Sequence, residues 1–340
     1  MFQRQTKVVR HVTDGPWTQP LFETRKHKPV EVPVALAPLA DTHGHLTSFR
    51  GTDPAMAVAR AALVGVRLLV VPVDPADDVP DVPAFLSWFH ETMDRAASLL
   101  ASAAQAGVRP PEFAGWQNLP ELTHNVHFVA GVHPYGAQKY LEDPSVAERL
   151  ELLLRDERCV GVGEFGLDFG PWNELEPDVQ IEAFRRQLRV AHEHDLPVEL
   201  HIRDAEDDEE ARAHEEAMRV LREEGVPEAG CDLHCFTSDV RVMTPFTKLG
   251  CHVAFGGAAT FARSADIREA AEVCPQGLLL SETDCPYMAP VPLRGLECEP
   301  AMVAFTAACV ADVREKAGAA SRENTYATLW KNANSFFRLG

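Results

Sequence analysis

The sequence predicts an α/β protein with a (β/α)8 TIM-barrel fold, and three observations support this fold class. Eight short apolar segments, typical of strands buried on both faces, recur along the 340 residues. Helical patterns lie between them, as parallel strands joined by crossover helices require. The length also suits one such barrel, because these domains run from about 200 to more than 400 residues.

The predicted strands are rich in apolar residues, and most of them end in His, Asp or Glu. The C-terminal ends of barrel strands meet at one mouth, which is where active sites of this fold lie. Polar residues at those ends are therefore candidates for a shared site. In chain order the strands are Val34–Asp41, Val66–Val73, Phe128–His133, Cys159–Glu164, Pro197–His201, Cys231–His234, Cys251–Phe255 and Leu278–Asp284.

Helical segments are indicated by capping residues and by apolar spacing. Asp53 is a suitable N-cap for the Ala-rich segment Pro54–Val64, and Pro144 suits the first position of another helix. The segment Pro177–His194 repeats apolar residues at the spacing of one helix face. The remaining helices are expected at Asp207–Glu224, Asp239–Leu249, Ser264–Cys274, Pro300–Lys316 and Ser321–Phe337.

Two regions extend the minimal barrel, which we expect to occupy residues 34–340. Residues 1–33 have mixed charge and several prolines, so we expect an extension packed on the surface or, alternatively, a basic arm that touches a partner or substrate. Residues 74–127, between the second and third strands, exceed an ordinary connection and contain an amphipathic helix around Phe85–Ala106. This insertion follows a strand, so we expect either a lid or substrate wall at the mouth or an enlargement of the surface.

Composition limits the classes of function. The net charge of −19 argues against a protein that coats nucleic acid, but it is compatible with an enzyme that clamps one phosphate locally. The eight cysteines form no Cys-x-x-Cys pair, and we interpret them as reduced core residues of a cytoplasmic protein. Neither a signal peptide nor a membrane-spanning stretch is expected, and the sequence leaves the oligomeric state open.

The first strand ends in a pair of histidines that suits a metal ion. His43 and His45 are two residues apart, so their side chains point to the same side of an extended chain. Gly44 removes bulk between them. Further candidate ligands follow other strands: Glu164, which is costly to bury without a cation, and His201, His234 and Asp284.

These four histidines and two carboxylates could hold two divalent ions, with one carboxylate bridging them. Zn²⁺, Mn²⁺ and Mg²⁺ all remain open for such ligands. A bridging water would become hydroxide near neutral pH. Arg203 could grip phosphate oxygens, or it could pair with Asp204 or with the acidic helix that follows. His133 is a candidate substrate contact or supporting residue, and Asp168 is expected to orient its loop.

From Leu39 to Phe337 the chain resembles the TatD family of metal-dependent deoxyribonucleases, a branch of the amidohydrolase-like TIM barrels. The resemblance is carried by six motifs in order: Asp41-Thr42-His43-Gly44-His45-Leu46, Gly131-Val132-His133-Pro134, Gly161-Val162-Gly163-Glu164-Phe165-Gly166-Leu167-Asp168-Phe169, Leu196-Pro197-Val198 with His201-Ile202-Arg203-Asp204-Ala205, His234-Cys235-Phe236, and Glu282-Thr283-Asp284-Cys285-Pro286-Tyr287.

The resemblance implies hydrolysis of phosphodiester bonds in DNA, with the strand bound locally at the barrel mouth. It implies that one ion is bound by His43, His45 and Asp284, that the other is bound by His201 and His234, and that Glu164 bridges them. Asp284 would also act as the general base. Two departures concern substrate contacts: Tyr135 stands where the family often has a second histidine, and Gly295–Pro300 replaces the usual Arg-Asn-x-Pro.

Three alternatives remain at the level of sequence. One is an amidohydrolase that cleaves a C–N bond, but its relatives commonly bridge their metals with a carboxylated lysine, and no lysine lies between Lys139 and Lys248. Another is a metal-binding scaffold without activity, which the complete set of expected ligands disfavours. The acidic composition keeps another ester or amide substrate open for the first alternative. A third alternative is a hydrolase of small phosphodiesters, which is close to the DNA hydrolase.

Overall fold

The computed structural model describes residues 21–339. Residues 1–20 of the expected extension lie outside this range. The following segment forms a short antiparallel ribbon of β1 (Phe22–Glu23) and β2 (Pro29–Val30). Phe22 is buried beneath the Arg60 guanidinium, whose carbon lies 4.6 Å from the ring centroid. Arg60 also pairs with Glu299 at 3.0 Å, so the ribbon is packed against the barrel.

The expected barrel of eight parallel strands is confirmed. The strands are hydrogen-bonded in chain order from the first to the eighth. Backbone bonds from Thr42 N to Ser281 O (3.2 Å) and from His45 N to Cys285 O (2.7 Å) join the two ends of the sheet. The strands are β3 (Leu39–Asp41), β4 (Val66–Val73), β5 (Val126–Ala130), β6 (Cys159–Asp168), β7 (Val198–Arg203), β8 (Cys231–Leu233), β9 (His252–Phe255) and β10 (Leu279–Ser281).

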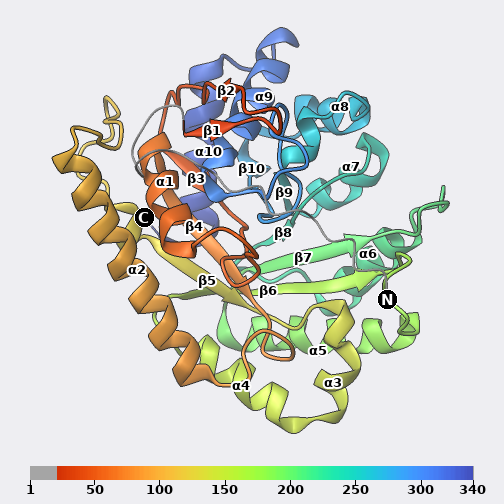
Figure 1. Cartoon of the computed structure of the whole chain (residues 1–340). Helices are drawn as coiled ribbons and strands as arrows, with labels where there is room; N and C mark the ends of the chain where they lie inside the picture. The colour runs from red at the N-terminus through yellow and green to blue at the C-terminus, as the bar shows by residue number, and fades with distance from the viewer. Residues whose placement is uncertain (1–20, 340) are drawn as a thin grey trace.

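Helices cover the outside of this barrel (Figure 1). The α-helices are α1 (Pro54–Val64), α2 (Val82–Gln105), α3 (Ala137–Glu142), α4 (Pro144–Leu154), α5 (Pro177–His194), α6 (Arg212–Glu224), α7 (Val240–Lys248), α8 (Ala265–Val273), α9 (Val303–Lys316) and α10 (Arg322–Phe336). Short 3₁₀ turns are η1 (Leu122–His124), η2 (Pro134–Gly136), η3 (Gly257–Thr260), η4 (Gln276–Leu278) and η5 (Pro300–Met302).

Several element boundaries differ from the sequence prediction. The first barrel strand begins only at Leu39, although it ends at Asp41 as expected. The last strand ends at Ser281, and beyond it individual backbone hydrogen bonds, such as that from Asp284 N to His43 O, replace regular pairing. Helix α6 begins at Arg212 and not at Asp207. There the carboxylates of Asp204 and Asp208 accept the free backbone N–H groups of the first turn, with Asp204 2.8 Å from Ala213 N.

The long segment between β4 and β5 contains helix α2. Its apolar face is buried at Phe85, Phe89 and Met93, and the helix lies along α1 on the outside of the barrel (Figure 1). It therefore occupies the place of the second crossover helix in lengthened form. Its first turns, with Phe85 and Trp88, face the loop that follows β3.

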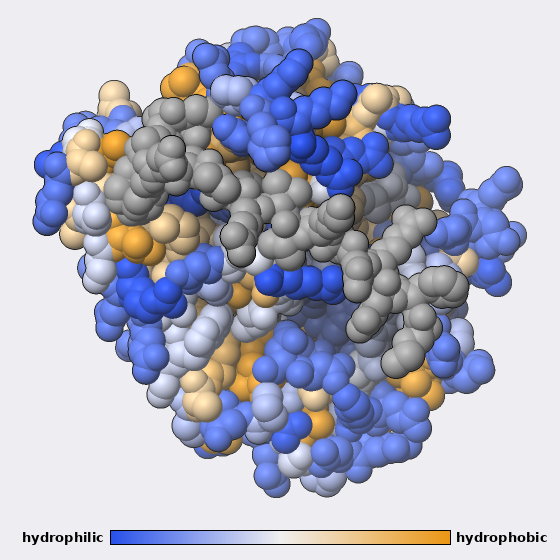
Figure 2. Space-filling model, in the orientation of Figure 1, coloured by the Kyte–Doolittle hydropathy of each residue, from blue (hydrophilic) through white to orange (hydrophobic). Residues whose placement is uncertain are grey.

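The surface in view is mostly hydrophilic, with scattered hydrophobic residues (Figure 2). All eight cysteines are free thiols, and six of them are buried. Among residues 21–339, the structure contains no helix with the length and apolar character needed to cross a bilayer.

Candidate metal centre

Glu164 lies at the centre of a cluster of histidines at the barrel mouth. One of its oxygens is 3.3 Å from His45 Nε2 and 3.7 Å from His43 Nε2. The other is 3.0 Å from His234 Nε2 and 3.1 Å from His201 Nδ1. The carboxylate is only 8% exposed, so these four imidazoles replace nearly all of its water contacts.

Asp284 completes the set of six residues expected from the sequence. Its Oδ1 atom lies 3.5 Å from His45 Nε2. Its backbone has φ of +53°, a conformation that residues other than glycine seldom adopt and that concentrates at functional sites. The structure thus brings together all six candidates, which come from five different strand ends.

The His-x-His pair is held where the barrel closes. A side chain at Gly44 would place its Cβ 2.9 Å from Cys285 Sγ, so only glycine fits between the two histidines without a shift. Behind the pair, buried Asp41 accepts hydrogen bonds from Thr283 N (2.8 Å) and Thr283 Oγ1 (2.7 Å). These bonds fix the end of β3 against the segment that carries Asp284.

The donor atoms fit a metal ion. His43 Nε2 and His45 Nε2 face each other at 3.2 Å, and two neutral imidazoles can both turn lone pairs toward a shared cation there. Three groups among the described residues have donor atoms that all lie within 4.8 Å of one another: His43, His45 and Asp284; His133, Glu164 and His201; and His43, His234 and Glu282. Mixed nitrogen and carboxylate ligands suit Zn²⁺ and Mn²⁺, as the sequence indicated.

A second layer of carboxylates contacts the far sides of these imidazoles. Glu199 Oε2 is 3.1 Å from His43 Nδ1, and Glu282 Oε1 is 3.4 Å from His234 Nδ1. Both carboxylates are almost fully buried. Such partners fix which ring nitrogen faces a metal ion. Neither acid was predicted as part of the site, although Glu199 precedes His201 by two residues and so shares its side of the strand.

Asp168 plays the same part for His201. Its Oδ2 atom lies 3.2 Å from His201 Nε2, while its Oδ1 atom accepts the backbone N–H of Gly170 at 2.8 Å. The loop-orienting bond expected from the sequence is present, and the imidazole contact is additional. His201 therefore faces Glu164 with Nδ1, whereas His43, His45 and His234 use Nε2.

The charged groups of the centre shift one another's pKa values. Burial opposes ionisation of Glu164, but the charge of His234 and hydrogen bonds from His201 and His234 hold the pKa of the carboxyl well below its usual value. Burial also opposes protonation of His234, but Glu164 and Glu282 raise the pKa of this imidazole well above its usual value. By contrast, burial and the neighbouring His234 lower the pKa of His43.

Arg203 lies at the edge of the centre, with 43% of its side chain exposed. It contacts Asp168 at 3.3 Å and lies 5.5 Å from the ring centroid of Trp172. Asp204 instead contacts His214 at 2.6 Å, so the alternative that Arg203 pairs with Asp204 or with the following helix is wrong. Strand pairing explains the outcome, because the register places Arg203 beside Asp168.

His133 lies beside His201, with 4.4 Å between their ring centroids. Burial, with a smaller contribution from His201, lowers the pKa of His133 to about 3, so its imidazole is neutral. Its ring also lies 4.4 Å from that of Tyr135, which is 42% exposed. His133 thus connects the buried centre to an exposed aromatic residue at the mouth.

Comparison with known proteins points to the same family as the sequence motifs. A family profile described as "TatD related DNase" matches residues 40–338. The uncharacterized metal-dependent hydrolase YabD of Bacillus subtilis is 32% identical over 251 residues, which are 74% of this chain and 92% of YabD. The 3′-5′ ssDNA/RNA exonuclease TatD of Klebsiella pneumoniae is 34% identical over 208 residues, 58% of this chain and 74% of that protein.

The fold has solved counterparts as well. The crystal structure of YJJV, a TatD homologue from Escherichia coli, superposes with a TM-score of 0.66 at 24% identity, covering 90% of this chain and all of YJJV. At that identity the likeness concerns the fold. The family profile, by contrast, covers nearly all of the barrel and includes every strand end described above. The chain is a metal-dependent hydrolase of the TatD-related DNase family.

Proposed function

We propose that this protein hydrolyses phosphodiester bonds of single-stranded nucleic acid, DNA in the first instance, at a centre for two divalent ions. The observation that carries the proposal is the position of Glu164, whose two oxygens each face two imidazoles. A carboxylate with ligands divided between its oxygens is suited to bridging a pair of ions.

The residues divide into two groups around that bridge. His43, His45 and Asp284 would hold one ion, and His201 and His234 would hold the other. The partners Glu199, Glu282 and Asp168 would keep the ligand nitrogens turned toward the ions. When bound, the ions would supply an acidified water and polarise a phosphoryl oxygen.

The chain's own groups would handle the proton and the substrate charge. Asp284 would accept the proton of the attacking water, because its carboxylate borders the cluster beside His45. Arg203 would donate hydrogen bonds to phosphate oxygens from its exposed position, while Asp168 holds its guanidinium in place. His133, being neutral, would offer a hydrogen bond without adding charge.

Two observations support a single-stranded nucleic acid as substrate. The relative from Klebsiella pneumoniae is named as an exonuclease for single-stranded DNA and RNA. Exposed aromatic residues also border the centre, namely Tyr135, Trp172 and Tyr287, and bases of single strands stack on such rings. An ester, amide or small phosphodiester is the second candidate, which the net charge of −19 favours because a long polyanion would be repelled.

Turnover assays separate these candidates. Single-stranded DNA, bis-p-nitrophenyl phosphate and dihydroorotate-type amides should each be offered with Mg²⁺, Mn²⁺ or Zn²⁺. We expect metal-dependent cleavage of DNA, none without added metal, and none by a folded Glu164→Ala variant. Turnover of the amide alone would refute the proposal, and turnover by Glu164→Ala at the wild-type rate would remove the bridging role.

A further inference from the structure

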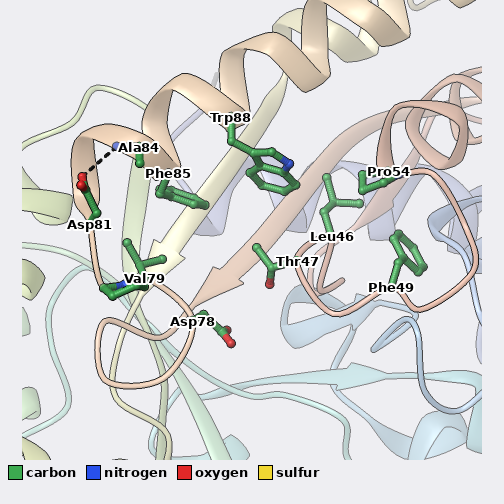
Figure 3. Close-up of a pocket in the computed structure, with 11 residues that line it drawn as sticks. Leu46, Thr47, Phe49, Pro54, Asp78, Val79, Asp81, Ala84, Phe85 and Trp88 are labelled. Carbon is green, nitrogen blue, oxygen red and sulfur yellow. Dashed lines mark hydrogen bonds between the residues drawn. The ribbon is translucent and has the colours of Figure 1, made fainter.

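A pocket of about 370 Å³ lies at the barrel mouth, between the loop that follows β3 and the first turns of α2. This volume is at the lower end of the range of about 300–1,000 Å³ for small-molecule sites. We call it the Trp88 pocket. Figure 3 shows Phe85 and Trp88 projecting from α2 toward residues of the loop after β3. Its lining includes Leu46, Phe49, Asp78, Val79, Phe85 and Trp88.

The Trp88 pocket lies next to the metal centre, both along the sequence and in the fold. Leu46 and Thr47 line it and directly follow His45. Asp78 lies on the other side, in the loop after β4. Burial raises the pKa of Asp78, and His45 and Glu164 are among the groups whose charges act on its carboxyl. A strand that placed its phosphate at the metal centre would therefore have a neighbouring nucleotide close to this pocket.

The lining selects an uncharged, flat group. Trp88 and Phe85 are 5.9 Å apart between ring centroids, and Trp88 and Phe49 are half-buried, so their faces are in part accessible. Among the described residues of the lining, the only charged side chains are Asp78 and Asp81. Asp81 is used to cap α2 through Ala84 N at 3.0 Å, as the dashed line in Figure 3 shows.

These features exclude a phosphate and admit a base. Two carboxylates and no cation would repel a phosphate group, whereas an aromatic heterocycle can stack on indole. Asp78 is a hydrogen-bond acceptor, so the lining also offers a polar group for the edge of a base.

We propose that the Trp88 pocket receives one base of the substrate strand, next to the phosphate that is cleaved, by stacking on Trp88. This inference rests on the proposed nuclease function and specifies how the substrate is held. A base within a duplex is stacked and paired, so it would have to leave the helix before entering the pocket. The pocket thus gives a physical reason for a preference for single strands.

The test combines enzyme variants with substrates that lack one base. Wild type, Trp88→Ala and Trp88→Phe are assayed with a single-stranded oligonucleotide and with a series in which each nucleotide near the cleaved bond is abasic in turn. Trp116→Ala is the matched control, because Trp116 is also half-buried but packs on Trp330, at 6.3 Å, away from the pocket. Circular dichroism checks that every variant is folded.

We expect one abasic position to raise the wild-type KM about tenfold, the effect of losing one stacked base. Trp88→Ala should raise KM equally for the intact strand, with no further loss on that abasic strand, while Trp88→Phe restores most of the affinity and Trp116→Ala changes nothing. Equal KM values for Trp88→Ala and wild type, or additive losses at every position, would overturn the proposal.

The pocket and the nuclease function can fail separately. If wild type cleaves intact and abasic strands alike, only the pocket assignment is wrong. If wild type cleaves no strand with any metal, the nuclease function is wrong, and fluorescence anisotropy of labelled intact and abasic strands on the metal-free protein then decides about the pocket. Tighter binding of the intact strand that Trp88→Ala abolishes would support it, and equal binding would overturn it.

Discussion

Most imidazoles of the metal centre have two polar contacts, one toward Glu164 and one away from it. His43, His201 and His234 are each held between this carboxylate and a second acid. The six inner residues could be predicted because each ends an apolar run. The outer acids could not, since a buried Glu such as Glu199 gives no signal of its own until the neighbouring strands are paired.

The outer acids should control metal affinity. Glu199→Gln and Glu282→Gln preserve shape but replace the carboxyl groups that contact His43 and His234 with amides. We expect each change to weaken binding of Zn²⁺ by about 10–100-fold, as measured by calorimetric titration. Glu182→Gln is the control, because Glu182 pairs only with the exposed Arg186 on α5. Unchanged affinity in both test variants would show that the acids are not positioning residues.

Arg203 should distinguish charged from neutral substrates. Because its guanidinium is exposed and held by Asp168, Arg203→Ala should raise KM for phosphodiesters more than for a neutral ester. The two substrates are compared by steady-state kinetics on the same preparation. If both KM values rise equally, the arginine has a structural role in its pairing with Asp168 and no part in phosphate recognition.

Metal binding should release protons at neutral pH. The carboxylates Glu164 and Asp284 raise the pKa of His45, and Asp168 and Glu164 raise that of His201, in both cases against the effect of burial. With pKa values above the usual value of about 6.5, these imidazoles keep their protons in the metal-free protein to a higher pH than a free imidazole does. Ligation needs the neutral form, so affinity should increase with pH through the neutral range.

Calorimetry in two buffers of different ionisation enthalpy measures this proton release directly. The apparent binding enthalpy at pH 7 should differ between the buffers in proportion to the protons released. An identical enthalpy in both buffers would mean that the imidazoles are already neutral before the metal binds.

The sequence predicts some strand and helix boundaries better than others. Buried runs such as Val66–Val73 coincide with a strand, and Pro54–Val64 with a helix, because periodicity and capping are local. Strand ends at the barrel closure, and the contact between Arg203 and Asp168, depend on register between segments far apart in the chain. Local pattern carries no information about such contacts, and this is where the predictions differ from the structure.

Gly163 in strand β6 lies too close to the adjacent strand to be replaced by a residue with a side chain without loss of stability. A Cβ at Gly163 would lie 2.7 Å from the Cβ of Glu199 on the adjacent strand. Gly163→Ala should therefore lower the free energy of unfolding by about 1–3 kcal/mol, as measured by denaturant titration. Gly277→Ala is the matched control, since nothing lies within 4 Å of its added Cβ and its φ is not positive. Equal stabilities of the two variants would contradict this packing.

The whole molecule places the candidate metal centre at the mouth of an acidic barrel. The net charge of −19 provides no general attraction for a polyanion, so the proposed function requires that the ions, Arg203 and stacking residues retain the substrate at one end. The family could be recognised from ordered motifs spread over the barrel, and the profile match over residues 40–338 confirms it. The position of α2 beside α1, by contrast, could be seen only in the structure.

Anomalous diffraction from crystals soaked in Zn²⁺ or Mn²⁺ tests the metal centre most directly. We predict two peaks per chain on either side of Glu164, one bound by His43, His45 and Asp284 and the other by His201 and His234, at ligand distances of about 2.0–2.2 Å. Peaks that lie away from Glu164, or soaked crystals in which these six side chains hold no ion, would contradict the proposed two-metal centre.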